Sequence, residues 1–302
     1  MAAGHHHHGH AHGALSGTDG RRLLVALGLI LALMAGEVVA GITARSLALI
    51  SDAAHMLTDA VAIGLALVAM RLAARAPRGA FTYGLGRAEP LSAMANGVTL
   101  VLLAVWIVYE SITRLIAPPA VEATLVLVVA LVGVAVNLLA TWVLAGADRR
   151  GLHVEGAFQH ILTDLYAFLG TALAAVVILL AGFDRADPIA ALLVAALMLR
   201  SGVGLIVSSG RVVLEAAPVG LEPAEIGNAL AQQPSVVEVH DLHVWELTSG
   251  FPALSAHVLV PADCDCHAVR RALEIVLRER FEIAHTTLQV EHAAAPGLLS
   301  ID

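Results

Sequence analysis

The sequence is poor in charge, cysteine and aromatic residues, and it contains no lysine. Only 14% of its 302 residues are charged, 4% are aromatic, and all 17 basic residues are arginine. Soluble domains are about one quarter charged, so the composition excludes an ordinary soluble globule and a disordered chain. Two cysteines exclude a disulfide scaffold. A net charge of −8 without a basic stripe gives no support for nucleic-acid binding, so no nucleic-acid partner is expected.

The chain is instead rich in long apolar runs. It is 58% hydrophobic, with a mean hydropathy of +0.82. A membrane-spanning helix needs roughly 20 apolar residues, and continuous rather than alternating runs favour helices over a barrel. Six runs qualify, giving an α-helical membrane protein with six transmembrane helices: Leu23–Ala44, Leu47–Met70, Pro90–Ser111, Ala123–Ala145, Val154–Ala181 and Asp187–Val207.

The polarity of the chain divides it into three parts. We expect a His-rich tail over residues 1–22, a transmembrane domain over residues 23–209 and a soluble domain over residues 210–302. Arginine is concentrated before the first helix, after the second and after the fourth. By the positive-inside rule both termini then lie in the cytoplasm, with the cell (inner) membrane as the expected location.

Two predicted spans carry the same string, His-x-Leu-Thr-Asp. It runs from His55 to Asp59 in the second helix and from His160 to Asp164 in the fifth. Residues four apart on a helix share a face, and ionisable groups inside a membrane are a functional hypothesis by default. The alternative is a purely structural role, in which each His–Asp pair is only a polar contact within packed helices.

Two imidazoles and two carboxylates suit a tetrahedral Zn²⁺ ion. Cd²⁺ or Co²⁺ would fit as well, whereas Cu(I) would require sulfur. Because ligands must lose protons before they bind metal, the same residues offer proton coupling. We expect His55 and His160 to carry the protons, since imidazole titrates near neutral pH.

With these motifs the sequence resembles the cation diffusion facilitator family, in its zinc-transporting branch. The resemblance covers roughly residues 21–292. It is carried by residues 46–59, by Phe81-Thr82-Tyr83-Gly84 and Arg87-Ala88-Glu89-Pro90, by residues 156–164, by Ala186-Asp187-Pro188-Ile189, by residues 239–245 and by residues 287–291.

The resemblance implies a homodimeric exporter in the lipid bilayer that exchanges Zn²⁺ for H⁺ by alternating access. It implies a transport site formed by His55, Asp59, His160 and Asp164, and a cytoplasmic α+β ferredoxin-like domain. It places regulatory zinc at His240, His257 and Glu291, and another position sometimes involved at His285. His292, Cys264 and Cys266 are further candidate ligands by composition only.

The C-terminal part alternates helix and strand patterns. Helices are predicted over Pro223–Gln232 and His267–Arg280, and strands over Val236–Leu247, Ala253–Val260 and Thr286–Glu291. The order α-β-β-α-β is typical of a small two-layer α+β domain.

Other residues leave alternatives open. The histidines of the tail form either a metal-collecting segment, which we favour, or an expression tag. Asp52 either serves the transport site, by lining the outer exit path or by accepting a hydrogen bond from a metal ligand, or caps the second helix. His153 lies at the cytoplasmic end of the fifth helix, as part of the metal path or as an interfacial histidine, and Glu89 is expected to pair with Arg87. The tail histidines are His5, His6, His7, His8, His10 and His12.

Other function classes fit less well. An intramembrane metalloprotease would need His-Glu-x-x-His, which is absent, so we expect no enzyme. An ATP-driven pump would need a phosphate-binding loop with lysine, so no nucleotide is expected. A membrane-anchored metal sensor signalling through its cytoplasmic domain is the remaining alternative, but it would not require two ligand pairs in mid-membrane.

Overall fold

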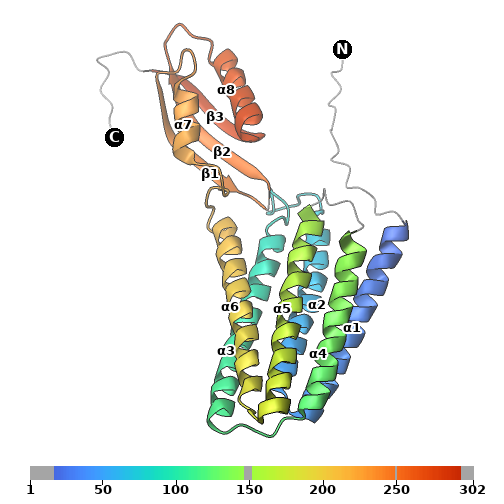
Figure 1. Ribbon diagram of the computed structural model, residues 1–302. Helices are drawn as coiled ribbons and strands as arrows, with labels where there is room; N and C mark the ends of the chain where they lie inside the picture. Colours follow the sequence, from blue (N-terminus) through green and yellow to red (C-terminus); the bar gives the residue numbers. More distant parts are fainter. Residues whose placement is uncertain (1–16, 146–151, 249, 294–302) are drawn as a thin grey trace. The chain divides into compact units, whose positions relative to one another are not determined.

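The computed structural model describes residues 17–145, 152–248 and 250–293 (Figure 1). Side chains are described within these ranges except for residues 17–30, 59, 63, 67, 140–145 and 152–163. Within this part of the chain, the residues before the C-terminal domain form long helices: α1 (Gly17–Ala44), α2 (Leu47–Ala73), α3 (Ala88–Ile116), α4 (Ala123–Ala145), α5 (Leu152–Ala181) and α6 (Ala186–Val213).

The helices begin and end where the sequence contains breakers, although several are longer than predicted. The helix α3 continues to Ile116 and stops before Pro118-Pro119, because proline lacks the N–H that a helix interior needs. The helix α5 ends at Ala181, and the next residue is Gly182, whose φ of +62° suits glycine. Polar residues beyond the predicted apolar runs, such as Arg71 and Arg211, belong to helices, since α2 continues to Ala73 and α6 to Val213.

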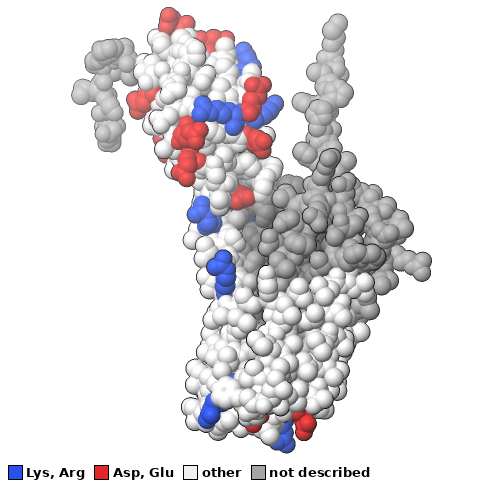
Figure 2. Space-filling view, in the orientation of Figure 1, with Lys and Arg blue, Asp and Glu red and all other residues white. Residues whose placement is uncertain are grey.

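Apolar surface covers the sides of these helices. Leu102, Tyr109 and Leu180 are each more than 60% exposed, and the face drawn in Figure 2 carries almost no charge along the helices. Exposed apolar area of this extent is expected against lipid. Among the described residues, Leu47–Ala73, Ala88–Ile116, Asp164–Ala181 and Ala186–Val213 are long and apolar enough to cross a membrane, and Leu31–Ala44 and Ala123–Leu139 are shorter apolar helices.

The chain divides into two compact units. The first comprises residues 1–57 and 103–198, and the second comprises residues 58–102 and 199–302. In the first unit α4 and α5 pack closely because Gly133 leaves room for the ring of Phe168. A Cβ atom at position 133 would lie 2.2 Å from that ring.

In the second unit α3 and α6 cross at two glycines. A Cβ atom on Gly97 would lie 2.8 Å from the carbonyl oxygen of Gly202, and one on Gly202 would lie 2.9 Å from that of Gly97. The two backbones therefore touch directly. Small residues at crossings of this kind are typical of helices that associate in membranes.

The C-terminal domain, also in the second unit, has the predicted order of elements. The order is α7 (Pro223–Ala231), β1 (Glu238–Glu246), β2 (Pro252–Val260), α8 (Cys266–Phe281) and β3 (His285–His292). The strand β2 pairs with β1 antiparallel and with β3 parallel. Leu254, Ala256 and Val258 alternate along β2 and pack against α7 and α8, so the other face of the sheet stays open.

Candidate metal centre

The start of α2 is held by a carboxylate from the start of α6. Asp187 accepts hydrogen bonds from the hydroxyl of Ser46, from the N–H of Leu47 at 2.7 Å and from the N–H of Ala48 at 3.4 Å. Ser46 also caps α2, since its Oγ accepts from the N–H of Leu49 at 3.3 Å. Both side chains are buried, so the beginning of α2 is fixed relative to α6.

About two turns into α2 lies His55, which faces Asp164 of α5. The Nε2 atom of His55 is 3.9 Å from Oδ1 of Asp164, and both residues are buried, at 7% and 8% exposed. Zn²⁺ binds imidazole nitrogen and carboxylate oxygen at about 2.0–2.2 Å. One ion between the two atoms is therefore within reach of both.

The other two predicted ligands lie on the same two helices. Asp59 is one turn after His55 in α2, and His160 is one turn before Asp164 in α5, so each shares a helix face with its partner. The side chains of Asp59, His160 and His153 lie outside the described residues. The same holds for the whole of the tail, with His5, His6, His7, His8, His10 and His12.

Two further carboxyl groups are buried in the same unit. Glu37 of α1 is 0% exposed and Asp52 of α2 is 2% exposed, and Glu37 interacts with both Asp52 and Asp164. Asp52 does not cap α2, contrary to one of our two expectations, because the helix begins five residues earlier and Ser46 caps it. A set of buried carboxyls attracts a cation or protons, because burying isolated negative charge is costly.

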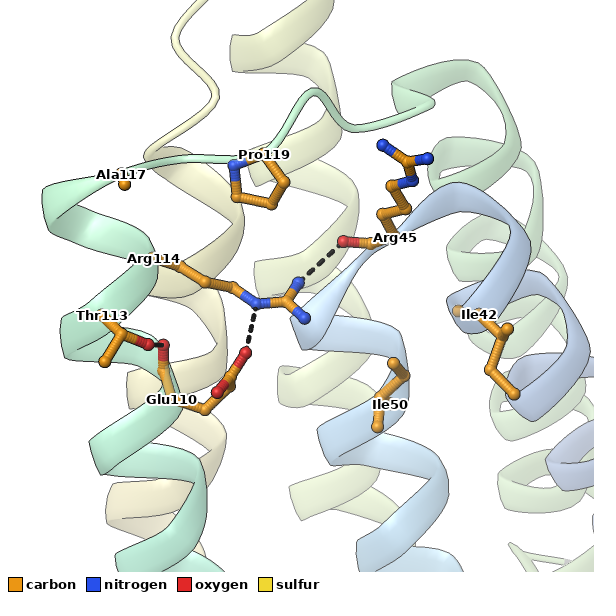
Figure 3. Close-up of a pocket in the computed structure, with 9 residues that line it drawn as sticks. Ile42, Arg45, Ile50, Glu110, Thr113, Arg114, Ala117 and Pro119 are labelled. Atoms are coloured by element: carbon orange, nitrogen blue, oxygen red, sulfur yellow. Dashed lines mark hydrogen bonds and ion pairs between the residues drawn. The ribbon is translucent and has the colours of Figure 1, made fainter.

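A separate cavity of about 570 Å³ opens at the turn between α1 and α2 (Figure 3). Arg114 of α3 donates to Glu110 at 2.9 Å and to the carbonyl oxygen of Arg45 at 2.8 Å. These bonds hold the α1–α2 turn against the end of α3. None of the predicted metal ligands lines this cavity, which is bounded by Gly41, Ile42, Arg45, Ile50, Glu110, Thr113, Arg114, Ala117 and Pro119.

On the open face of the C-terminal sheet two predicted ligands meet. His240 of β1 pairs with His257 of β2, and their ring centroids are 5.4 Å apart. A β-bulge follows His240, with Asp241 at a φ of +51°. The hydrogen bond from His243 at 2.9 Å holds the pKa of Asp241 below its usual range, with help from His257.

The remaining predicted ligands of this domain are dispersed. Glu291 is paired with Leu259 and accepts from Gln289. His285 lies at the other end of β3 against the rings of Tyr83 and Phe251, and His292 lies beside Cys266. Across the described ranges no three His, Cys, Asp or Glu side chains form a ready-made metal site.

The prediction of an ion pair between Glu89 and Arg87 is wrong. Arg87 forms its ion pair with Glu215 at 2.6 Å, because the end of α6 brings that carboxylate to it. Glu89 instead lies 3.4 Å from the hydroxyl of Thr248, which also donates to the carbonyl oxygen of Gly86 at 2.9 Å. These contacts connect the loop before α3 to the C-terminal domain within the second unit.

Comparisons with known proteins agree with this organisation. Residues 23–214 match the cation efflux transmembrane domain, and residues 218–293 match the cytoplasmic domain of cation efflux proteins. The chain is 36% identical over 95% of its length to the "cadmium, cobalt and zinc/H(+)-K(+) antiporter" of Bacillus velezensis, covering 93% of that protein. It is also 36% identical over 97% of its length to the zinc transporter ZitB of Escherichia coli, covering 94% of that protein.

A solved structure matches the C-terminal part of the chain. The metal-bound C-terminal domain of the CzcD transporter from Cupriavidus metallidurans is 35% identical to it. The match covers 24% of this chain and 99% of that one, with a TM-score of 0.23.

Proposed function

The chain belongs to the cation efflux (cation diffusion facilitator) family, and from this premise we propose that it exports Zn²⁺ from the cytoplasm in exchange for protons. Proteins of this family are membrane transporters and not enzymes. Cd²⁺ and Co²⁺ are further candidate substrates, since a similar protein is named for them. The observation that carries the proposal is the buried pair of His55 and Asp164 between two apolar helices.

In the proposed site His55, Asp59, His160 and Asp164 bind the ion together. Each helix supplies one imidazole and one carboxylate, one turn apart. The two carboxylates balance the charge of the divalent ion, and the two imidazoles make the site favourable for Zn²⁺ over the hard cations Mg²⁺ and Mn²⁺.

Proton coupling follows from competition for the same atoms. Metal binds imidazole only after Nε2 or Nδ1 has lost its proton, so metal loading releases protons and protonation favours metal release. Glu37 and Asp52 add buried carboxyl groups to this interior. We infer that these carboxyl groups take up protons when the site is empty, because negative charge inside a membrane is costly. Transport by alternating access then needs only a change in which side of the membrane the site faces.

The finer organisation is part of the same proposal. It comprises a tail over residues 1–22, six membrane spans within residues 23–209 and a ferredoxin-like cytoplasmic domain over residues 210–302. The arginine distribution puts both termini in the cytoplasm. The match to a cytoplasmic cation efflux domain supports a homodimer in the inner membrane, and His240, His257 and Glu291 are candidate regulatory zinc ligands.

Proteoliposomes that contain a pH-sensitive dye test the proposal. Zn²⁺ added outside should drive proton movement in the parent protein, and Asp164→Asn and Asp59→Asn should each abolish it. Glu110→Gln, which removes a carboxylate from a different pair, is the matched control and should retain transport. Transport at the parent rate in both site variants would refute the assignment. A folded parent that moves neither ion would favour the membrane-anchored sensor.

A further inference from the structure

Both cysteines of the chain lie at one corner of the C-terminal domain, beside a histidine from another element. Cys266 is the first residue of α8, Cys264 lies two residues before it, and His292 is the last residue of β3. The Nε2 atom of His292 is 3.4 Å from Sγ of Cys266 and 3.1 Å from the carbonyl oxygen of Cys264. One imidazole nitrogen therefore contacts both cysteine residues.

The distance between sulfur and nitrogen matches a metal site. Two ligands of a tetrahedral ion, sulfur at about 2.3 Å and nitrogen at about 2.0–2.1 Å, are about 3.5 Å apart. Cys266 and His292 meet this requirement at 3.4 Å. The two atoms therefore already have the separation that two ligands of one ion require.

The surroundings favour a bound thiolate. Cys266 begins a helix of 16 residues, and the positive end of a helix stabilises a thiolate. The neighbouring carboxylate of Asp265 caps the helix, because its Oδ1 accepts hydrogen bonds from the N–H groups of His267 and Ala268. Both cysteines are free thiols and partly exposed, so a cation from solution can reach them.

We propose that Cys266 and His292 are the first two ligands of a soft-metal site for Cd²⁺ or Zn²⁺. The thiol of Cys264 supplies a third ligand by rotating about its own side-chain bonds, and water supplies a fourth. The thiol protons leave to solvent as the metal–sulfur bonds form. Nε2 of His292 gives up the hydrogen that it donates to the carbonyl oxygen of Cys264, so that the neutral ring carries its proton on Nδ1 and binds the metal through Nε2. This site is separate from His240 and His257, and it does not depend on the proposed transport function.

The cysteine count makes the test specific. Because the chain has only two cysteines, any cadmium–thiolate absorption band in the full-length protein must come from this corner. Cd²⁺ is titrated into purified, reduced protein in detergent, and the ultraviolet charge-transfer band is recorded. The variants are Cys266→Ser, Cys264→Ser and His292→Gln, with circular dichroism to confirm that each is folded. His240→Gln is the control at the other histidine pair.

The proposal predicts a band that saturates at one Cd²⁺ per chain. Cys266→Ser should abolish that stoichiometric band, and Cys264→Ser should reduce its intensity. His292→Gln should weaken binding about tenfold or more, and His240→Gln should leave the band unchanged. A parent protein without the band overturns the proposal. So does a full band in Cys266→Ser, or an affinity that His292→Gln leaves unchanged.

Discussion

At the scale of single residues, Asp187 has the most consequential set of hydrogen bonds described for the helices. It accepts from Ser46, Leu47 and Ala48 at the start of the helix that carries His55. Hydrogen bonds to a charged group contribute about 1.5–3 kcal/mol each. We expect Asp187→Asn to lower the free energy of unfolding by about 1–3 kcal/mol, because one carboxylate oxygen is replaced by a donor.

Thermal unfolding in detergent measures this effect, and the proteoliposome assay measures its consequence for transport. Asp184→Asn, three residues earlier in the chain, is the matched control and should unfold at the parent temperature. Equal unfolding temperatures for Asp187→Asn and the parent would contradict the role of Asp187 as an anchor of α2.

Asp265 is the second residue with a defined structural role, as the N-cap of α8. Its hydrogen bonds from the N–H groups of Ala268 and His267 lower its pKa below the usual value. Its contribution to stability is therefore complete above the unfolded pKa of about 3.9 and is lost as the pH falls through the lower folded pKa. Asp265→Ala should increase hydrogen exchange in the first turn of α8 roughly several-fold at pH 7.

The matched control for this cap is Asp263→Ala in the same loop, which should leave exchange in α8 unchanged. Exchange is measured by mass spectrometry on the full-length protein. Identical exchange in Asp265→Ala and the parent would mean that the cap does not hold the helix start.

Sequence patterns identify residues whose partners lie nearby in the chain, and they miss contacts between residues that are far apart in it. The spacing of His55 and Asp59 within one helix is a local signal, so it is readable from the chain. The bond between Asp187 and Ser46 joins residues 141 positions apart, and no local pattern encodes that distance. The pairing of Cys266 with His292 was missed for the same reason, since only the fold brings β3 to the start of α8.

At the scale of elements, the contact between α4 and α5 depends on one missing side chain. A methyl group on Gly133 would overlap the ring of Phe168. We expect Gly133→Ala to cost about 1–3 kcal/mol through overpacking, and adding Phe168→Leu should restore part of that loss. Unfolding temperatures of the two single variants and the double variant in detergent measure the coupling.

Gly36 in α1 provides the opposite control. No atom lies within 4 Å of a Cβ built there, so Gly36→Ala should be neutral or stabilise α1 by about 0.5–1 kcal/mol. If Gly133→Ala is as harmless as Gly36→Ala, close packing at Phe168 is not what holds α4 to α5.

The order of elements could be predicted well, but helix ends and partners could not. Apolar runs and prolines indicate where helices lie, and the α-β-β-α-β pattern of the C-terminal domain is confirmed. Helix ends differ by several residues, because polar residues such as Arg211 continue a helix beyond its apolar run. Which helices touch depends on the fit of small residues such as Gly97 and Gly202, which hydropathy does not report.

At the scale of the whole molecule, the two cysteines allow a direct test of orientation. Both lie in the C-terminal domain, which the arginine distribution assigns to the cytoplasm. A membrane-impermeant maleimide should label the parent protein in inside-out vesicles. Right-side-out vesicles should give less than about one tenth of that signal, because the reagent cannot cross the bilayer.

Ala120→Cys in a Cys264→Ser/Cys266→Ser background provides the reciprocal control. Ala120 is exposed in the connection between α3 and α4, so its thiol should react from the outside only. Labelling of the parent protein from the outside would reverse the proposed topology.

The bond between Ser46 and Asp187 also has a consequence for how the protein is made. A ribosome adds about 5–20 residues per second, so the 141 positions between the two residues correspond to roughly 7–28 s of synthesis. During this interval α2 has been translated while the carboxylate that anchors its start does not yet exist. The hydrogen bonds at the start of α2 therefore cannot form until the start of α6 has been synthesised. The final packing of α2 is a late event in biogenesis.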